Sequence, residues 1–332
     1  MHGTPHPEVS ILIVSYNTRE LTLAAIDAVV RETHVPHEII VVDNCSTDGS
    51  GEAIAAHSAR PRLVALHENI GFGRANNVAA RYAQADHLLL LNPDTVVLYH
   101  AVDTLLAFAR ARPDAMIWGG RTIFDDGSLN ASSCWQRITL WNLFCRSSGL
   151  AAVRRASPVF NGEAYGGWQR DTERQVDIVS GCFLMVKRTL WRELGGFDPT
   201  FYMYGEEADL CLRARSMGAR PLITPKATIV HYGGASERTR AGKMEKLLAA
   251  KMSLISRHVP RWQQPLARMM LKMWPMTRLI ATSLAARLTS SKYASEAAGT
   301  WREVWRHRSQ WQVGYPPSSF DSASPSRIIE QG

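Results

Sequence analysis

Residues 9–18 read VSILIVSYNT, a nearly continuous apolar run that ends abruptly in polar residues. Such a run predicts a strand that is buried on both faces, which is typical of parallel sheets. The same pattern returns in EIIVVDN (38–44) and LLLLNPD (88–94). Helical patterns at 20–31 and 74–83 separate these runs, so the N-terminal part is expected to form a mainly parallel α/β sheet.

Polar side chains stand at the end of each of these three strands. Ligands of open α/β sheets bind beyond the carboxyl ends of the strands, so these positions are candidate site residues. Asn, Asp and Ser also favour ordinary turns, but their recurrence in three units favours a shared site. The residues are Ser15 and Asn17, Asp43 and Asn44, and Asn92 and Asp94.

The second half of the chain is less regular. Residues 123–174 place aromatic residues among Gly, Ser and Arg, which suits either a lid over an acceptor or a variable insertion. Strand character returns at 176–186, and 206–217 is helical in pattern. After residue 237 the sequence predicts helices rich in Met, Leu and Trp, in which Pro265 and Pro275 must start or kink a helix.

Composition and charge divide the chain further. Its 332 residues, 45% hydrophobic and 20% charged, exclude wholesale disorder and collagen-like or disulfide-scaffold classes. The net charge is +8, yet residues 238–311 carry 15 Lys and Arg against 3 Asp and Glu, which leaves the remainder at −4. We therefore expect an N-terminal tail (1–8), an acidic body (9–236), a basic helical region (237–311) and a disordered tail (312–332).

Several features point to the cytosol. The first eight residues lack the apolar core of a signal peptide, and no apolar run reaches the length of a membrane-spanning helix. The five cysteines are odd in number and lack CxxC spacing, so we expect buried reduced thiols rather than disulfides or a zinc site. They are Cys45, Cys134, Cys145, Cys182 and Cys211.

Six motifs in order resemble the family 2 glycosyltransferases, and most closely their bacterial rhamnosyltransferase-like branch. The nucleotide-sugar half is matched by VSILIVSYNT (9–18), EIIVVDNCSTDGS (38–50), ENIGFGRANN (68–77) and LLLLNPDT (88–95). The acceptor half is matched by residues 178–218 and by ATIVHYGGAS (227–236). The resemblance implies a GT-A, Rossmann-like catalytic domain carrying a basic, amphipathic helical extension.

The resemblance also implies a nucleotide pocket. Asp43 would accept the imide N–H of uracil or thymine, since a carboxylate is a pure acceptor; otherwise it caps a helix. Glycines in ENIGFG would allow the backbone to come close to the nucleotide; otherwise they only mark the start of a helix. The expected pocket residues are Ser15, Tyr16, Asn17, Asp43, Asn44, Asn69, Gly71, Gly73, Asn76 and Asn92.

Asp94 stands where the family has its metal-binding DxD motif, here Asn92-Pro93-Asp94. A divalent cation, Mg²⁺ or Mn²⁺, would bind its oxygens, with waters completing the shell. It would bridge the diphosphate and stabilise the leaving group. His231 resembles the late metal-binding histidine, although a lone His after an apolar strand is often structural.

The acidic cluster GEEAD (205–209) matches the position of the family's general base. Glu207 is the base candidate by position, with Glu206 and Asp209 beside it. Crowded carboxylates raise one another's pKa, which suits a base. They also suit the first turn of a helix, and Asp209 can pair instead with Arg213 four residues on.

Together these motifs predict an inverting glycosyltransferase with dTDP-L-rhamnose as favoured donor, a UDP-sugar as runner-up, and a lipid-linked or nascent bacterial saccharide as acceptor. The basic helices suit an anionic membrane surface or a plain solvated face, and no motif supports nucleic acid. A sugar nucleotidyltransferase would need a Gly-rich, Lys-containing loop, and this sequence has none. An inactive nucleotide-sugar-binding scaffold stays open, because NPD and GEEAD depart from the commonest patterns.

Overall fold

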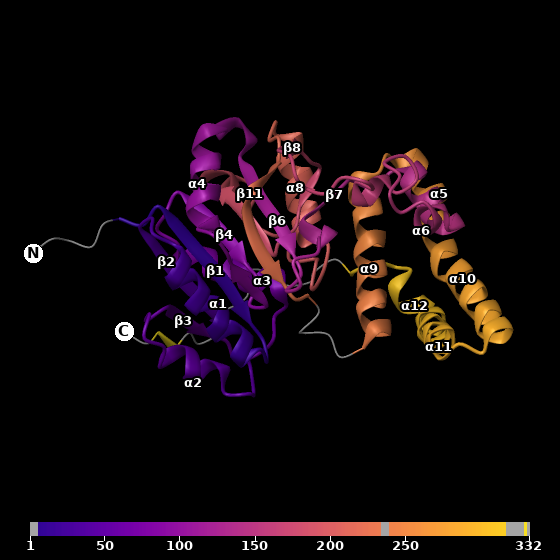
Figure 1. Cartoon of the computed structure of the whole chain (residues 1–332), viewed down its shortest axis with the longest axis horizontal. Coiled ribbons are helices and arrows are strands. Elements are labelled where there is room, and N and C mark those ends of the chain that lie inside the picture. The colour runs from indigo at the N-terminus through magenta and orange to yellow at the C-terminus, as the bar shows by residue number, and fades with distance from the viewer. Residues whose placement is uncertain (1–5, 234–238, 317–328, 331–332) are drawn as a thin grey trace, which may run out of the picture.

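The computed structural model describes residues 6–233, 239–316 and 329–330. Its centre is a mixed sheet in the order β12-β3-β2-β1-β4-β10-β6-β11-β5, with β8 paired to β11 (Figure 1). The strands are β1 (Val9–Ser15), β2 (His37–Asp43), β3 (Arg62–Ala65), β4 (His87–Leu91), β5 (Thr95–Val97), β6 (Ile117–Ile123), β8 (Arg174–Gln175), β10 (Phe183–Lys187), β11 (Leu222–His231) and β12 (Ile329–Glu330).

The N-terminal half is parallel, as expected from its buried apolar runs. Strands β3, β2, β1 and β4 all run in one direction, and every residue of β1 is buried. Separate apolar clusters cover the two faces of the sheet. The helices of this half are α1 (Arg19–Glu32), α2 (Ser50–Ala55), α3 (Phe72–Tyr82) and α4 (Ala101–Ala111). The prediction of a mainly parallel α/β fold is confirmed.

One strand reverses the sheet, and this decides where the second half contributes to a site. Strand β10 is antiparallel to both β4 and β6, while β6 is parallel to β11. Strand β11 therefore runs in the same direction as β1 and β4. Its last residue, His231, consequently lies at the sheet edge where β1, β2 and β4 also end.

Residues 124–216 lie between β6 and β11 in the chain; they contribute β8 and β10 to the large sheet and otherwise form loops and short helices. A small sheet pairs β7 (Cys134–Trp135) with β9 (Ile178–Val179). The helices here are α5 (Leu140–Ser148), α6 (Leu150–Val153), α7 (Arg188–Glu193) and α8 (Glu206–Ser216). Arg170, which is almost fully buried, holds the irregular loops together by donating to the carbonyls of Tyr165, Trp168, Ala131 and Ala164.

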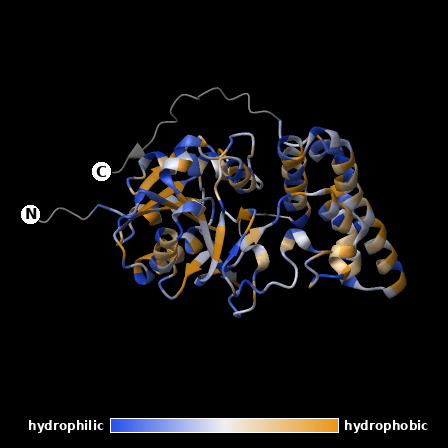
Figure 2. Cartoon of the chain, turned by 90° about the horizontal axis from the view of Figure 1, so that it is seen from above, coloured by the Kyte–Doolittle hydropathy of each residue, from blue (hydrophilic) through white to orange (hydrophobic). Residues whose placement is uncertain are grey.

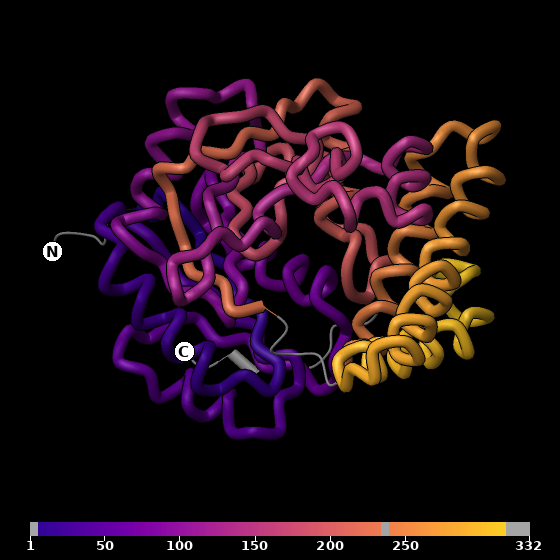
Figure 3. The backbone as a smooth tube through the Cα atoms, turned by 45° about the vertical axis from the view of Figure 1, so that its right-hand side comes forward, coloured from indigo at the N-terminus to yellow at the C-terminus, as the bar shows by residue number. Residues whose placement is uncertain are grey.

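The C-terminal helices form a layer with its own apolar core (Figures 1 and 3). Pro265 lies in the first turn of its helix, as expected, whereas the helix continues through Pro275. The helices are α9 (Arg240–His258), α10 (Gln264–Thr289), α11 (Lys292–Arg306) and α12 (Arg308–Trp311). Helix α9 stands between the sheet and the others. Among the described residues, no helix combines the length and apolarity needed to span a membrane.

The predicted tail (312–332) falls only partly within the described residues; 317–328 and 331–332 lie outside them. Within it, Tyr315 is held in place. Its hydroxyl donates to the carbonyl of Met203, its N–H donates to Ser253, and its ring packs edge-on against Phe201. Residues 329–330 pair with β3 as an antiparallel edge strand.

Candidate functional site

A cavity of about 910 Å³ opens at the sheet edge where β1, β4 and β11 end. Its walls come from these strand ends, from the start of α3, from the first turn of α8 and from one face of α9. Pockets for small ligands occupy roughly 300–1,000 Å³, so this one is at the large end of the range. Of the predicted site residues, Tyr16, Asn44, Asn69, Gly71, Asn92, Asp94, Glu206, Glu207 and His231 line it.

One corner of the cavity brings together Asn92, Asp94 and His231. The Asp94 carboxylate lies 3.4 Å from Nε2 of His231, and the Asn92 side-chain nitrogen lies 3.5 Å from the same atom. These residues lie close together because β4 and β11 run in the same direction and end at the same edge of the sheet. Asn130 fixes the end of β11 by donating to the carbonyl of His231.

The surroundings of His231 favour its protonated form. Burial alone would lower the pKa of His231, but Cys182 and Asp94 outweigh it and raise the pKa to about 10. Burial would likewise raise the pKa of Asp94, and the hydrogen bond with His231 lowers it instead. Surroundings that favour a proton on an imidazole also favour a divalent cation in its place, with release of that proton.

The residues of the corner fit a divalent cation. Asn92 Oδ1 and His231 Nδ1 are buried and have no hydrogen-bond partner among the described residues. Two oxygen-bearing side chains and an imidazole suit Mg²⁺ or Mn²⁺, with the remaining ligands supplied by water or phosphate. The ligand roles of Asp94 and His231 stay predictions.

Glu206 and Glu207 occupy the first turn of α8 and both line the cavity. Burial raises the pKa of both carboxyls, and the charge of Glu207 raises that of Glu206 further. Glu206 Oε2 is buried without a partner among the described residues. Two desolvated carboxyls side by side are the arrangement from which a proton acceptor of raised basicity is made. Glu207 as general base stays a prediction.

Asp209 has a different setting from its two neighbours. Its side chain is fully buried, does not line the cavity, and forms ion pairs with Arg213, Arg257 and His258 at 2.7–3.2 Å. It thus forms the helical pair with Arg213 that the sequence left open, and ties α8 to α9. The other guanidinium nitrogens of Arg213 donate to the carbonyls of Leu194 and Gly196.

A chain of amides shapes the wall beside β1 and β2. The Asn44 side chain donates to Asn69 Oδ1 at 2.9 Å, and that oxygen also accepts from the Gly71 N–H. Gly71 has φ +86°, and a Cβ there would lie 2.5 Å from the Tyr202 carbonyl oxygen. No other residue fits at this position without moving the loop that leads into α8.

Asp43 lies at the end of β2, next to Asn44 but outside the cavity lining. Its Oδ1 is buried without a partner among the described residues, and burial raises its pKa. A buried acceptor without a donor is costly to keep. It is therefore a ready partner for an N–H group of a ligand.

Four predicted pocket residues take local structural positions outside the lining. The Ser15 hydroxyl bonds Thr22, and the Asn17 side chain accepts from the Thr47 N–H. Asn76 donates to the carbonyl of Phe72 one turn earlier. At Gly73 a Cβ would lie 3.4 Å from Glu206 Cβ, so its small size lets α3 approach α8.

Comparison with known proteins agrees with this geometry. The family model described as "Glycosyl transferase family 2" matches residues 10–192, more than half of the chain. The chain belongs to glycosyl transferase family 2. It is therefore a glycosyltransferase, and its motifs place it with the rhamnosyltransferase-like members. Both predictions are confirmed.

Relatives of this glycosyltransferase include two bacterial proteins. It is 27% identical to the O-antigen biosynthesis protein RfbC of Myxococcus xanthus over 73% of this chain, which is only 18% of RfbC. It is 28% identical to the N-acetylglucosaminyl-diphospho-decaprenol L-rhamnosyltransferase of Mycobacterium tuberculosis, over 70% of this chain and 80% of that protein.

The glycosyltransferase also resembles a solved structure, a mannosyltransferase from Pyrobaculum calidifontis in complex with GDP-Man and Mn²⁺. The TM-score is 0.57 at 18% identity, covering 93% of this chain and 88% of the other. At that identity the likeness concerns the fold alone. The expected GT-A fold is confirmed.

Sequence reasoning missed several residues of the cavity in this family 2 glycosyltransferase. The Tyr202 hydroxyl donates to Asn69 Oδ1, and Glu163, Arg146 and Lys251 line the cavity as a buried ion cluster. The pairing of Glu163 with α5 and α9 joins segments far apart in the chain. No local sequence pattern indicates such pairs; the sequence shows that α9 is basic but not which residues it pairs with.

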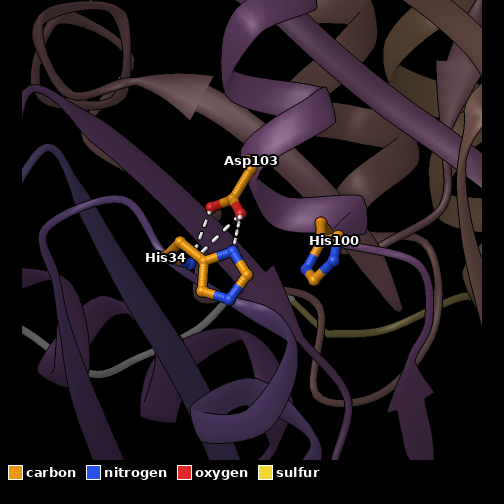
Figure 4. Close-up of side chains that lie close together, drawn as sticks. All are labelled: His34, His100 and Asp103. Atoms are coloured by element: carbon orange, nitrogen blue, oxygen red, sulfur yellow. Dashed lines mark hydrogen bonds and ion pairs between the residues drawn. The ribbon is translucent and has the colours of Figure 1, made fainter.

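A histidine cluster lies elsewhere on the surface (Figure 4). His34, His100 and Asp103 group together, with His34 Nδ1 3.5 Å from the Asp103 carboxylate. That carboxylate accepts from the backbone N–H groups of His34 and Val35, so it secures the turn after α1. None of these residues lines the cavity.

Proposed function

We propose that this glycosyltransferase moves a sugar from a nucleotide sugar to a lipid-linked or nascent bacterial cell-surface saccharide, with inversion at C1. L-Rhamnose from dTDP-L-rhamnose is the favoured donor, and a UDP-sugar is the alternative. The mycobacterial relative supports this choice, because its name specifies rhamnosyl transfer to a diphospho-decaprenol-linked sugar.

The observation that carries the proposal is one cavity lined both by Glu207 and by the corner of Asp94 and His231. Glu207 takes the proton of an acceptor hydroxyl, whose oxygen attacks C1 of the donor sugar. The bond from C1 to the diphosphate oxygen breaks, and its electron pair leaves with the nucleoside diphosphate. Attack opposite to the leaving group inverts the anomeric centre.

Asp94 and His231 would hold a divalent cation, Mg²⁺ or Mn²⁺, and Asn92, whose Oδ1 is buried without a partner among the described residues, would offer a further oxygen. When bound, such a cation neutralises charge that develops on the diphosphate. Burial would raise the pKa of Asp94, but the hydrogen bond with His231 lowers it, which favours the ionised carboxylate.

Asp43 reads the base of the nucleotide. Its buried Oδ1, which has no partner in the described part of the chain, accepts the N3–H that thymine and uracil share. This contact favours thymine and uracil over cytosine and adenine, whose corresponding ring nitrogen carries no hydrogen, but does not separate dTDP from UDP. Asn44, Asn69 and Gly71 form the adjoining wall.

The deciding experiment measures release of nucleoside diphosphate from a panel of dTDP- and UDP-sugars, with Mn²⁺ and Mg²⁺ as cations. Asp94→Ala and Glu207→Gln are expected to lose about 100-fold or more in turnover. Glu20→Gln, whose side chain is exposed on α1, is the matched control and keeps its activity. Unchanged turnover in both site variants would contradict this mechanism, whereas no turnover by the unchanged chain with any donor would leave it as a nucleotide-sugar-binding scaffold.

Helix α10 suggests where the enzyme works. Ala267, Leu271 and Trp274 are buried on one side of it, yet the other side is also apolar and exposed, with Leu288 83% and Ile280 53% accessible. The exposed apolar residues recur every three, four or seven positions and form one stripe, named here the α10 stripe: Leu266, Met269, Met273, Ile280, Leu284 and Leu288. Hydrophobic colour marks these outer helices as well as the sheet in Figure 2.

Cations accompany the α10 stripe. Arg261, Arg268, Lys272 and Arg287 belong to the same helical segment, which holds no Asp or Glu from 261 to 289. An apolar stripe with basic neighbours fits the interface of an anionic bilayer, where acyl chains meet negative headgroups. We therefore propose a peripheral position on the inner face of the cytoplasmic membrane, where a lipid-linked acceptor resides.

Vesicle sedimentation tests this position. The variant Met269→Gln/Ile280→Gln/Leu284→Gln is expected to bind phosphatidylglycerol-containing vesicles at least about tenfold more weakly than the unchanged chain. The control is Val153→Gln/Val159→Gln, which alters equally exposed apolar residues outside α10. Equal vesicle binding by all three proteins contradicts the proposal. So does a stripe variant that only converts a dimer to a monomer.

A further inference from the structure

A short loop leads the chain into the candidate base. Residues 201–205, named here the α8 loop, precede Glu206 and Glu207, and the last four of them line the cavity. Tyr204 in this loop has φ +68°, in the left-handed region that L side chains rarely adopt. A residue keeps such a conformation only where its surroundings hold it there. The contacts of the α8 loop therefore decide where the two glutamates lie.

One side of the α8 loop is fastened to the nucleotide wall. The Tyr202 carbonyl accepts from the N–H of Phe72, the first residue of α3, at 3.2 Å. The Tyr202 hydroxyl donates to Asn69 Oδ1, also at 3.2 Å. In the proposed function this wall receives the nucleotide, so these two contacts fix the loop relative to the donor.

The other side of the α8 loop is fastened by Tyr315, from the far end of the chain. The Tyr315 hydroxyl donates to the carbonyl of Met203, and it lies 3.4 Å from the carbonyl oxygen of Lys246 in α9. The Tyr315 ring meets the buried ring of Phe201 edge-on, with the two centroids 6.1 Å apart. Two of the five loop residues thus contact one side chain.

Tyr315 is itself anchored to the C-terminal layer. Its N–H donates to Ser253 Oγ in α9 at 2.8 Å. Trp311, the last residue of α12, is buried, and its indole N–H donates to the Val304 carbonyl at 2.9 Å. Helix α12 lies beside α9 (Figure 1). The Tyr315 ring packs against the apolar core of this layer and also against the core on one face of the sheet.

Packing alone does not require the hydroxyl of Tyr315. A phenylalanine ring fills the same space beside Phe201, whereas only a hydroxyl donates to the Met203 carbonyl. That carbonyl belongs to the peptide bond that leads into Tyr204, the residue with the left-handed φ. The hydrogen bond therefore acts at the point of the loop where the backbone most needs support.

We propose that Tyr315 is a positioning residue of the active site, which holds the Met203 carbonyl and so keeps Glu207 aimed at the acceptor hydroxyl. Tyr202 sets the α8 loop against the nucleotide wall, and Tyr315 sets it against the C-terminal layer. Tyr315 itself does not line the cavity. This inference rests on the proposed function, in which Glu207 is the general base. A misplacement of about 1 Å can cost about 100-fold in rate, so a single bond outside the cavity has a measurable effect.

The test is Tyr315→Phe, which removes the hydroxyl and keeps the ring. Tyr293→Phe is the matched control, because Tyr293 is 74% exposed on α11 and does not line the cavity. The full chain is used, at a temperature where every variant is folded. The measurements are amide hydrogen exchange across residues 201–208, the calorimetric Kd of dTDP and of UDP with Mn²⁺, and kcat for transfer from dTDP-L-rhamnose to a short-chain polyprenyl-diphosphate-linked N-acetylglucosamine.

Tyr315→Phe is expected to speed exchange across residues 201–208 about tenfold and to lower kcat about tenfold, as loss of one hydrogen bond implies. Nucleotide Kd stays within about twofold, because Tyr202 still fastens the other side of the loop. Tyr293→Phe changes none of these values. Added to Glu207→Gln, Tyr315→Phe lowers kcat by less than about twofold further, since no base is left to position. A purely structural role predicts neither this split between kcat and Kd nor this dependence on Glu207.

Four outcomes overturn the positioning role. Unchanged exchange means that the hydroxyl does not hold the loop, and faster exchange with unchanged kcat makes Tyr315 a structural residue only. A nucleotide Kd that rises in step with the loss of kcat places the effect on donor binding. A full tenfold loss in the Glu207→Gln background means that Tyr315 does not act through Glu207.

Failure of the proposed function is distinguishable from failure of this inference. In that case the unchanged chain transfers no sugar from any donor, so every kcat comparison is lost together. Hydrogen exchange needs no turnover, and it still decides whether the Tyr315 hydroxyl holds the α8 loop.

Discussion

Nε2 of His231 lies 3.4 Å from the carboxylate of Asp94, although one residue ends β11 and the other follows β4. The reversal at β10 makes this possible, because it leaves β11 running in the direction of β4. A cation held at this corner thus depends on both halves of the sheet.

Replacing His231 by Ala should weaken the affinity of the enzyme for its cation. Removing one ligand or its immediate support typically costs about 10- to 100-fold in metal affinity, so the Mn²⁺ concentration for half-maximal donor turnover should rise by that factor. His100→Ala is the control, since His100 belongs to the surface cluster away from the cavity. An unchanged Mn²⁺ dependence in His231→Ala would remove His231 from the ligand set.

Gly71→Ala should damage the nucleotide wall and the fold together. The left-handed φ of +86° costs an alanine about 1 kcal/mol, and the clash with the Tyr202 carbonyl adds about 1–3 kcal/mol. The matched control is Gly127→Ala, where φ is +80° but no atom lies within 4 Å of the added Cβ. Urea unfolding measures the free energy of unfolding of both variants, and the difference between them isolates the clash. Equal losses of stability in the two variants would mean that there is no clash at Gly71.

Asp209→Asn should behave as a structural variant. Breaking a buried charge network typically costs about 3–5 kcal/mol, because Arg213, Arg257 and His258 lose their shared acceptor. Thermal unfolding should therefore shift markedly, whereas the folded fraction keeps donor turnover within about tenfold. Turnover as low as that of Glu207→Gln, with an unchanged melting temperature, would instead place Asp209 in the chemistry.

Acid should unfold the enzyme partly through Glu163. Burial would raise the pKa of Glu163, but Arg146 and Lys251 lower it from 4.5 to about 2 in the folded chain. A carboxyl with a lowered folded pKa stabilises the fold above pH 4.5, and this contribution fades as the pH falls toward 2.

Comparison with Glu163→Gln isolates that contribution. The variant should be less stable than the unchanged chain at pH 7, and the difference in unfolding free energy should shrink as the pH falls from about 5 toward 3. Urea titrations at several pH values measure it. A difference that is independent of pH would mean that the charge of Glu163 does not stabilise the fold.

The sequence was sufficient for the parallel half and for much of the candidate site. Buried apolar runs at 9–14, 38–42 and 88–91 identify strands, and their polar ends share an edge for topological reasons. Asn44, Asn92 and Asp94 were therefore found from local patterns alone. The family motifs added Glu207 and His231, which no local rule distinguishes from ordinary helix and strand ends.

Contacts between residues far apart in the chain could not be predicted from the sequence. Asp209 has the same local signals as Glu206 and Glu207, yet its partners Arg257 and His258 come from α9. Likewise, the Pro/Ser content of 312–332 predicts disorder, while Tyr315 is held by residues more than sixty positions away. Periodicity shows which face of α9 is buried, but not that a cavity lies against part of it.

Helix α9 lies beyond the predicted boundary near residue 237, yet one of its faces lines the same cavity as the strand ends. In the proposed function, donor recognition is concentrated in the strand ends, and one face of α9 supplies a further part of the cavity lining. Chimeras between relatives joined at this point should therefore exchange acceptor preference while retaining donor preference. Laboratory evolution of new acceptors should begin on α9 and leave the sheet untouched.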